Sequence, residues 1–167
     1  MEKHFSMMCA VSLAALLAGC AQPQPPGPVT RTGAGTAMIS STTTVPTGYE
    51  TIYLSGMTGT LPTPSGGQAP DSGDTEAQAV RALDKIKAAL AEQGLSLGDV
   101  VMMHAYLAAD PATGRGDGKG WGAAYSKFFG TADQPNKPSR TSVTVTLGSP
   151  AAKIEIETIA VRKPKPV

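Results

Sequence analysis

Two segments near the C-terminus alternate between polar and apolar residues. The first covers residues 138–145 (PSRTSVTV), the second covers residues 153–162 (KIEIETIAVR), and both are rich in β-branched side chains. Alternation with a period of two residues predicts β-strands. The sequence therefore predicts a C-terminal strand pair that closes the domain, with Arg140 near the start of one strand and Glu155 near the start of the other.

The chain before these segments contains signals for a strand and a helix. Residues 50–55 (ETIYLS) favour a strand that ends at Gly56. Thr75 and Gln78 have the spacing of a capping box, which predicts the start of an amphipathic helix. Gly94 then predicts the end of this helix, because glycine readily adopts the backbone conformation that follows a helix.

A second strand and a second helix are predicted further along. Residues 100–107 favour a strand, and a glycine-rich loop follows it. Apolar residues then recur at positions 121, 124, 125 and 128, which predicts an amphipathic helix that runs to Gly130. This order of elements predicts the α+β class, with two helices covering one face of a sheet. The uncovered face is expected to be buried in an oligomer.

The N-terminus has the features of a targeting segment. Lys3 precedes an apolar run over residues 7–18, which is shorter than the ~20 residues of a membrane-spanning helix. The run ends in the letters LAGC, a small-residue cleavage site followed by Cys20, as in a bacterial lipoprotein signal. We therefore expect lipidation of Cys20 and an anchor in the cell envelope, on the periplasmic side of the outer membrane. An ordinary secretory signal is the alternative.

These features divide the chain into four parts. They are a lipoprotein signal peptide (1–19), the lipidated cysteine with a Pro/Thr/Ser-rich linker (20–46), the folded domain (47–163) and a short tail (164–167).

Composition limits the chemistry of the folded part. Cys9 and His4 lie in the predicted signal peptide, so His104 is the single histidine of the mature chain and no free thiol remains. We therefore predict no metal site and no cofactor. The net charge is +1 and no basic stripe stands out, so no nucleic-acid partner is predicted.

The C-terminal pattern resembles the signature of the RidA (YjgF-type) family of reactive-imine deaminases. The shared pattern is a P-x-R motif, a spacer, and then an I-E-I-E-x-I-A run. The resemblance extends over about residues 48–162. It implies the RidA fold, which is chorismate-mutase-like, assembled as a barrel-like homotrimer with clefts between the subunits.

The resemblance also implies roles for four residues. Arg140 would hold the carboxylate of a substrate, and Glu155 would position the attacking water. Gly56 would place its backbone against the ligand, and Ser142 stands where deaminase-active members often have cysteine. From the residues alone, Arg140 could instead form a structural ion pair with Glu155 or Glu157, and Gly56 could merely end a strand.

Two positions depart from the family pattern. The family's N-terminal segment with a cleft tyrosine is absent, and residues 41–44 stand in its place. Gly122 occupies a position where the family commonly has asparagine. The sequence therefore supports two hypotheses. One is hydrolysis of 2-imino or enamine acids to 2-oxo acids and ammonia; the other is non-catalytic binding of small carboxylates. Ribonuclease activity, which some relatives have, has no supporting basic patch or base-stacking aromatics in this sequence.

Overall fold

The second alternating segment forms strand β6 (Ile154–Arg162), which lies in the middle of a sheet. The structure is a computed structural model and describes residues 25–165. In it, β6 pairs antiparallel with β3 (Glu50–Thr58) on one side and with β4 (Val100–Ala108) on the other. The alternation has the expected consequence for burial: Ile154 and Ile156 are fully buried, whereas Glu155 and Glu157 are partly exposed.

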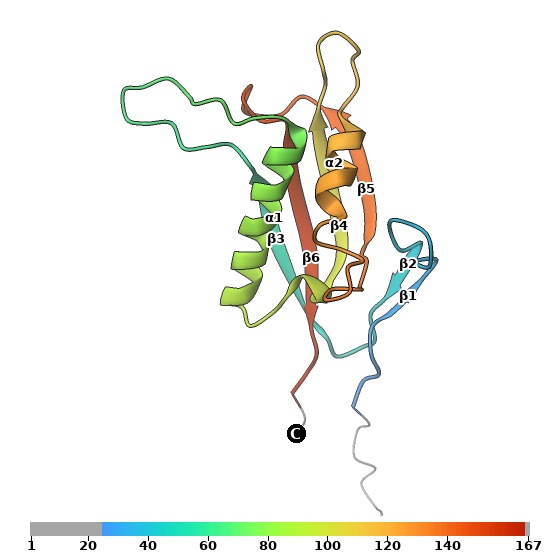
Figure 1. Ribbon diagram of the computed structural model, residues 1–167. Coiled ribbons are helices and arrows are strands. Elements are labelled where there is room, and N and C mark those ends of the chain that lie inside the picture. Colours follow the sequence, from blue (N-terminus) through green and yellow to red (C-terminus); the bar gives the residue numbers. More distant parts are fainter. Residues whose placement is uncertain (1–24, 166–167) are drawn as a thin grey trace, which may run out of the picture.

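The first alternating segment forms strand β5 (Ser139–Val145) at the edge of the same sheet, whose order is β3-β6-β4-β5 (Figure 1). The predicted C-terminal strand pair is therefore wrong, because β4 lies between β5 and β6. The reason is the helix between β4 and β5. It crosses over the sheet face, so that β5 returns parallel to β4 on its free side.

Two helices, α1 (Thr75–Glu92) and α2 (Gly118–Tyr125), cover one face of this sheet (Figure 1). The core forms where α1 meets the central strands, with Leu83, Ile86 and Leu90 fully buried against the cluster that contains Met103 and Ile156. A short 3₁₀ helix (Leu97–Asp99) leads into β4. The predicted α+β class, with both helices on one face, is confirmed.

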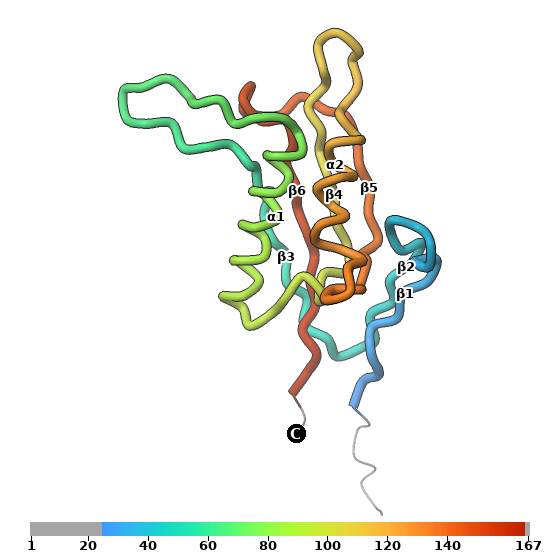
Figure 2. Tube along the Cα trace, in the orientation of Figure 1, coloured from blue at the N-terminus to red at the C-terminus, as the bar shows by residue number. Residues whose placement is uncertain are grey.

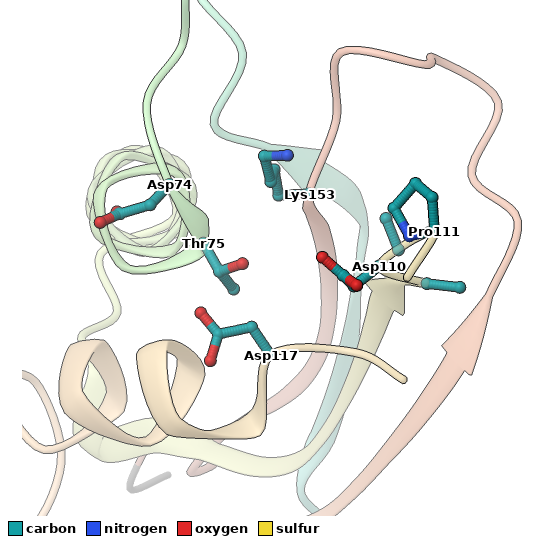
Figure 3. Close-up of a pocket in the computed structure, with 8 residues that line it drawn as sticks. Asp74, Thr75, Asp110, Pro111, Asp117 and Lys153 are labelled. Carbon is teal, nitrogen blue, oxygen red and sulfur yellow. The ribbon is translucent and has the colours of Figure 1, made fainter. Parts of the chain in front are cut away.

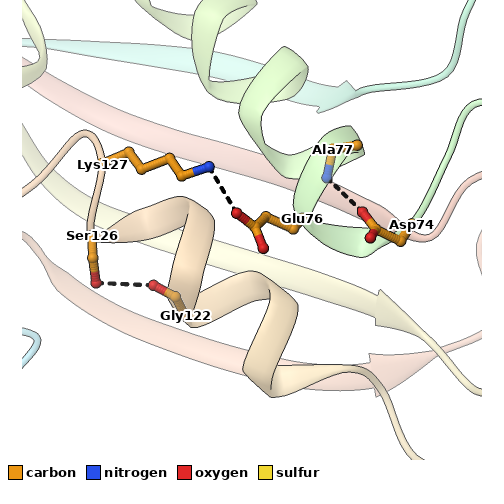
Figure 4. A network of polar contacts seen from close by, with 6 residues as sticks. All are labelled: Asp74, Glu76, Ala77, Gly122, Ser126 and Lys127. Atoms are coloured by element: carbon orange, nitrogen blue, oxygen red, sulfur yellow. Dashed lines mark hydrogen bonds and ion pairs between the residues drawn. The ribbon is translucent and has the colours of Figure 1, made fainter.

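The start of α1 differs from the predicted capping box. Asp74 is the N-cap, and its carboxylate accepts a hydrogen bond of 2.9 Å from the Ala77 amide (Figure 4). Gln78 is buried, and its side chain bonds other segments instead: Nε2 donates to the Ala151 carbonyl at 3.0 Å, and Oε1 accepts from the Lys153 amide at 2.8 Å. The glutamine thus fastens the helix to the start of β6.

The second helix is shorter than predicted. The chain continues beyond Tyr125 in turns, in which the amides of Phe128 and Phe129 both donate to the Tyr125 carbonyl. Lys127, in these turns, forms an ion pair of 2.7 Å with Glu76 of α1 and so links the two helices (Figure 4). Gly130 has a φ of +74°, which ends this segment in a conformation that favours glycine.

Residues 30–44, inside the range predicted as linker, contain a hairpin of β1 (Thr30–Thr32) and β2 (Thr42–Thr44). The hairpin lies beside β5 (Figure 2), and the Arg31 guanidinium donates to the carbonyls of Gly98 and Val100 at 3.0 and 3.2 Å. The predicted signal peptide and Cys20 lie outside the described residues. Neither helix within residues 25–165 has the length and apolarity needed to cross a membrane.

Candidate functional site

Arg140 lies on the face of β5 that the helices cover. It pairs in parallel with Met103, which is fully buried under α1 and α2, so the two side chains project to the same face. Two residues along, Ser142 pairs with the buried Ala105 and projects the same way. Because β5 is the edge strand, this part of the helix-covered face lies at the border of the domain.

Aromatic rings of α2 form a platform for the guanidinium of Arg140. Its Cζ atom lies 4.3 Å from the centroid of the Tyr125 ring and 5.1 Å from that of the Trp121 ring. Both rings are almost completely buried and meet edge to face. A cation stacked on aromatic rings is held electrostatically without using its hydrogen-bond donors. The fork of donors is therefore fixed in place and remains available.

The donors of Arg140 are only weakly engaged. Nη1 is shielded from solvent and has no hydrogen-bond partner in the described part of the chain, and Nη2 contacts the sulfur of Met38 at 3.7 Å. Burial lowers the pKa of Arg140 from its ordinary value, an effect that the nearby Tyr125 partly opposes. A cation that is desolvated and lacks a carboxylate partner is a strong attractor for an anion.

Ser142 and Tyr125 supply further polar groups beside the arginine. The Trp121 indole N–H donates to the Ser142 Oγ at 3.1 Å, so the serine's own proton can be donated elsewhere. The Tyr125 hydroxyl is buried and unpartnered among the described residues, and burial raises its pKa to about 12. It is therefore a neutral donor at physiological pH.

Glu155 lies on the opposite face of the sheet. It alternates with the buried Ile154 and Ile156, so it projects away from the helices. Its backbone partner on β3 is Thr58, but its carboxylate reaches Gly56, which lies in a register shift between Leu54 and Met57. A Cβ atom on that glycine would lie only 2.1 Å from Glu155 Oε1. The absence of a side chain at position 56 thus makes room for the carboxylate.

Glu157 shares this open face and is occupied by its neighbours on β4. Its Oε1 atom accepts from the Tyr106 hydroxyl at 3.0 Å and lies 2.8 Å from the His104 Nδ1. The hydrogen bond to Glu157 raises the pKa of Tyr106, with smaller contributions from burial and from the two glutamate charges. Of the two glutamates, Glu155 is therefore the one without a side-chain hydrogen bond among the described residues.

The structural ion pair considered for Arg140 is absent within residues 25–165 of one chain, because Arg140 lies on the helix-covered face and both glutamates lie on the other. The four predicted site residues form two separate pairs. Arg140 and Ser142 lie on the same face of β5, and the carboxylate of Glu155 on β6 lies against Gly56 on β3.

A cavity of about 320 Å³ lies elsewhere, between the starts of the two helices and the end of β4 (Figure 3). Three aspartates line it, but each accepts hydrogen bonds from local backbone amides: Asp74 from Ala77, Asp110 from Ala112, and Asp117 from Gly120. These carboxylates therefore have structural roles. No cluster of three potential metal ligands occurs in residues 25–165.

Sequence reasoning missed the surroundings of Arg140. Met38 is 102 residues away along the chain, and no pattern in the sequence links the two. The roles of Trp121 and Tyr125 had a partial signal, since their helical spacing marks a buried face. That spacing could not show that the two buried rings contact the guanidinium of Arg140.

The helix-covered four-stranded sheet, with an arginine on an aromatic platform at its edge, places the chain among RidA-type α+β domains. The family model described as endoribonuclease L-PSP matches residues 42–162, and the chain belongs to this family, which corresponds to the RidA family.

Relatives and solved structures agree with this assignment. The chain is 36% identical over 102 residues to the 2-iminobutanoate/2-iminopropanoate deaminase of Escherichia coli K12, covering 60% of this chain and 72% of the relative. It is 33% identical over 100 residues to a RutC family protein of Haemophilus influenzae, with the same coverage.

Among solved structures, the YjgF gene product of E. coli is 34% identical with a TM-score of 0.53, over 67% of this chain and 80% of that chain. E. coli TdcF with bound serine is 30% identical with a TM-score of 0.54, over 71% and 84%.

Proposed function

We propose that this protein hydrolyses 2-imino or enamine acids to 2-oxo acids and ammonia. The observation that carries the proposal is the state of Arg140, a partly buried guanidinium on an aromatic platform that has no carboxylate partner among residues 25–165. A planar fork of this kind suits bidentate binding of a substrate carboxylate. The similarity to a 2-iminobutanoate/2-iminopropanoate deaminase supports the choice of substrate class.

The chemistry requires little more than positioning. Arg140 holds the carboxylate, and Glu155 orients a water molecule towards the imine carbon. The water oxygen bonds to that carbon, and a proton passes to nitrogen. The resulting carbinolamine expels ammonia, which leaves a C=O bond where the C=N bond was. Because the imine carbon is already electrophilic, orientation of water and substrate supplies most of the rate enhancement.

A single chain cannot bring these two groups to one substrate, because Arg140 and Glu155 lie on opposite faces of its sheet. We propose that a homotrimer completes the site, with Arg140 and Ser142 from one subunit and Glu155 and Gly56 from the next. The open sheet face supports this proposal, since it carries Tyr53, which is 77% exposed. Burial of that face between subunits would remove it from water.

A subunit-mixing experiment tests the shared site. Arg140→Ala and Glu155→Gln are each expected to abolish hydrolysis of enzymatically generated 2-iminopropanoate. If each site takes one residue from each of two subunits, mixed trimers of the two variants contain some wild-type sites, and activity returns. If mixing restores nothing while both variants remain trimeric by light scattering, the shared site is wrong.

Arg140→Lys is the matched variant for the carboxylate contact. Lysine keeps the charge but loses the planar fork, so we expect it to recover little of the binding that Arg140→Ala loses, ~2–4 kcal/mol. Wild-type turnover by Arg140→Ala would overturn the proposed function.

A non-catalytic carboxylate-binding module is the second candidate. Two features favour it: residues 41–44 replace the cleft segment of the family, and Gly122 replaces its asparagine. Calorimetry with 2-oxobutanoate separates the candidates. A binder gives heat that depends on Arg140 but no hydrolysis, whereas the enzyme gives both.

We also propose that Cys20 is lipidated and anchors the protein in the cell envelope. The apolar run that ends in LAGC supports this. Labelling with a fatty-acid analogue should mark the wild type and not Cys20→Ser. Equal labelling of both would contradict the proposal.

A further inference from the structure

The connection between β1 and β2 places a methionine against the guanidinium of Arg140. The Sδ atom of Met38 lies 3.7 Å from Nη2, and the residue is 47% exposed. A thioether sulfur is only a weak hydrogen-bond acceptor, so this contact leaves the arginine largely free to bind an anion. Within a single chain the methionine is thus exposed to solvent, and it also touches the group proposed to hold the substrate.

Two contacts fix the position of this methionine. The Lys137 Nζ donates to the carbonyls of Ala34 at 2.9 Å and Ala37 at 2.7 Å, which ties the connection to the segment before β5. The Met38 methyl carbon lies 3.6 Å from the point where a Cβ atom on Gly122 would sit. A Cβ atom at this distance would make an ordinary van der Waals contact, so alanine would fit at position 122, and only a longer side chain directed at Met38 would crowd it.

We propose that Met38 is a modification site, at which a peroxide converts the thioether to a sulfoxide that occupies Arg140 and blocks carboxylate binding. One oxygen atom of the peroxide O–O bond is transferred to sulfur, which is oxidised by two electrons. The other oxygen leaves as water when the oxidant is hydrogen peroxide. The inference rests on the proposed function, since it takes Arg140 as the carboxylate site.

The physical basis is a change in acceptor strength at one position. The sulfoxide oxygen is polar and accepts hydrogen bonds strongly, unlike the thioether sulfur. Because an S–O bond is much shorter than the 3.7 Å between Sδ and Nη2, an oxygen added on that side lies within hydrogen-bond distance of Nη2. The neutral sulfoxide of Met38 then competes with the substrate carboxylate for Arg140. Because it belongs to the protein itself, this competitor is always present.

Exposure favours Met38 over the other described methionines. Met57 and Met102 are half-buried, and Met103 is fully buried in the core. Peroxide is therefore expected to reach Met38 first.

The test follows oxidation and binding together on the folded protein. Hydrogen peroxide is added in steps, and peptide mass spectrometry measures the oxygen gained at each methionine. Calorimetry then measures the Kd for 2-oxobutanoate before and after oxidation, and after repair with methionine sulfoxide reductases. We expect the Kd to rise about 10- to 100-fold once Met38 is oxidised, and to return on repair. In Met38→Leu, the Kd for 2-oxobutanoate should be the same before and after peroxide treatment. In Met57→Leu, the Kd should rise on treatment as it does in wild type.

A second measurement needs no ligand. Trp121 is the single tryptophan of the chain, and its ring lies 5.1 Å from the guanidinium carbon. Oxidation should change its fluorescence in wild type but not in Arg140→Ala, which lacks the partner of the sulfoxide.

The outcomes separate this inference from the proposed function. If 2-oxobutanoate does not bind before oxidation, the proposed function fails, and fluorescence alone then decides whether the sulfoxide engages Arg140. If 2-oxobutanoate binds equally well after complete oxidation of Met38, only this inference is overturned. Oxidation of Met57 or Met102 ahead of Met38 also overturns it.

Discussion

Substitution of Gly56 by alanine should disable Glu155 without unfolding the protein. The new Cβ atom would lie 2.1 Å from Glu155 Oε1 and 3.0 Å from its Cγ atom, distances at which the glutamate must move. Displacement of a catalytic group by about 1 Å can cost about 10²-fold in rate. We therefore expect kcat/KM for 2-iminopropanoate to fall about 100-fold, equivalent to ~2.7 kcal/mol of transition-state stabilisation.

The fold should tolerate this change. Gly56 does not have a positive φ, and Glu155 is a partly exposed side chain that can rotate towards solvent. Replacement of glycine by alanine also lowers the conformational entropy of the unfolded chain, which stabilises the fold by ~0.4–1 kcal/mol. The free energy of unfolding, measured in urea, should therefore change by less than about 1 kcal/mol.

A double-mutant cycle shows whether the effect acts through Glu155. Gly56→Ala should add almost nothing to the loss already caused by Glu155→Gln, because both changes remove the same contribution. Ser55→Ala, an exposed neighbour on β3, is the matched control and should keep its activity. If Gly56→Ala turns over substrate like wild type, or if its loss adds fully to that of Glu155→Gln, the reasoning is refuted.

Three further predictions concern stability and titration. Gln78→Leu leaves the Lys153 amide and the Ala151 carbonyl without this partner and should lower the free energy of unfolding by ~1–3 kcal/mol in urea titrations. A loss under ~1 kcal/mol would contradict the role assigned to this glutamine. Glu157→Gln removes the carboxylate that stabilises the neutral form of Tyr106, so the pKa of Tyr106 should fall towards its ordinary value. NMR titration measures this pKa, and an unchanged value would exclude the hydrogen bond between the two side chains. Gly94→Ala should lower the stability measured in thermal unfolding by ~1 kcal/mol, because the residue has a φ of +68°, which alanine adopts only with strain. Unchanged stability would contradict this and would mean that the backbone at the helix end changes conformation.

The sequence predicted local structure well where one physical signal dominated. Alternation in β6 and the glycine at position 94 identified a strand and a helix end that the structure contains. Strand order was not predictable in the same way, because alternation shows which face of a strand is buried but not which strand lies beside it. The failure to place β4 between β5 and β6 has this origin.

The candidate site shows the same limit. Motif spacing identified Arg140 and Glu155 as candidates. Their placement on opposite faces depends both on which face each residue takes in the alternation along its strand and on the order of the strands. Met38 could not be predicted at all, since its contact depends on how the segment before β3 folds back along the edge of the sheet.

The hairpin of β1 and β2 also limits how far the domain can extend from an anchored N-terminus. Arg31 fastens the hairpin to the domain, so only residues 21–29 remain between Cys20 and the first strand. Nine residues span at most about 30 Å when fully extended. A lipid on Cys20, as proposed, would therefore hold the domain within about 30 Å of the bilayer, and the proposed site would meet solutes that pass close to the membrane surface.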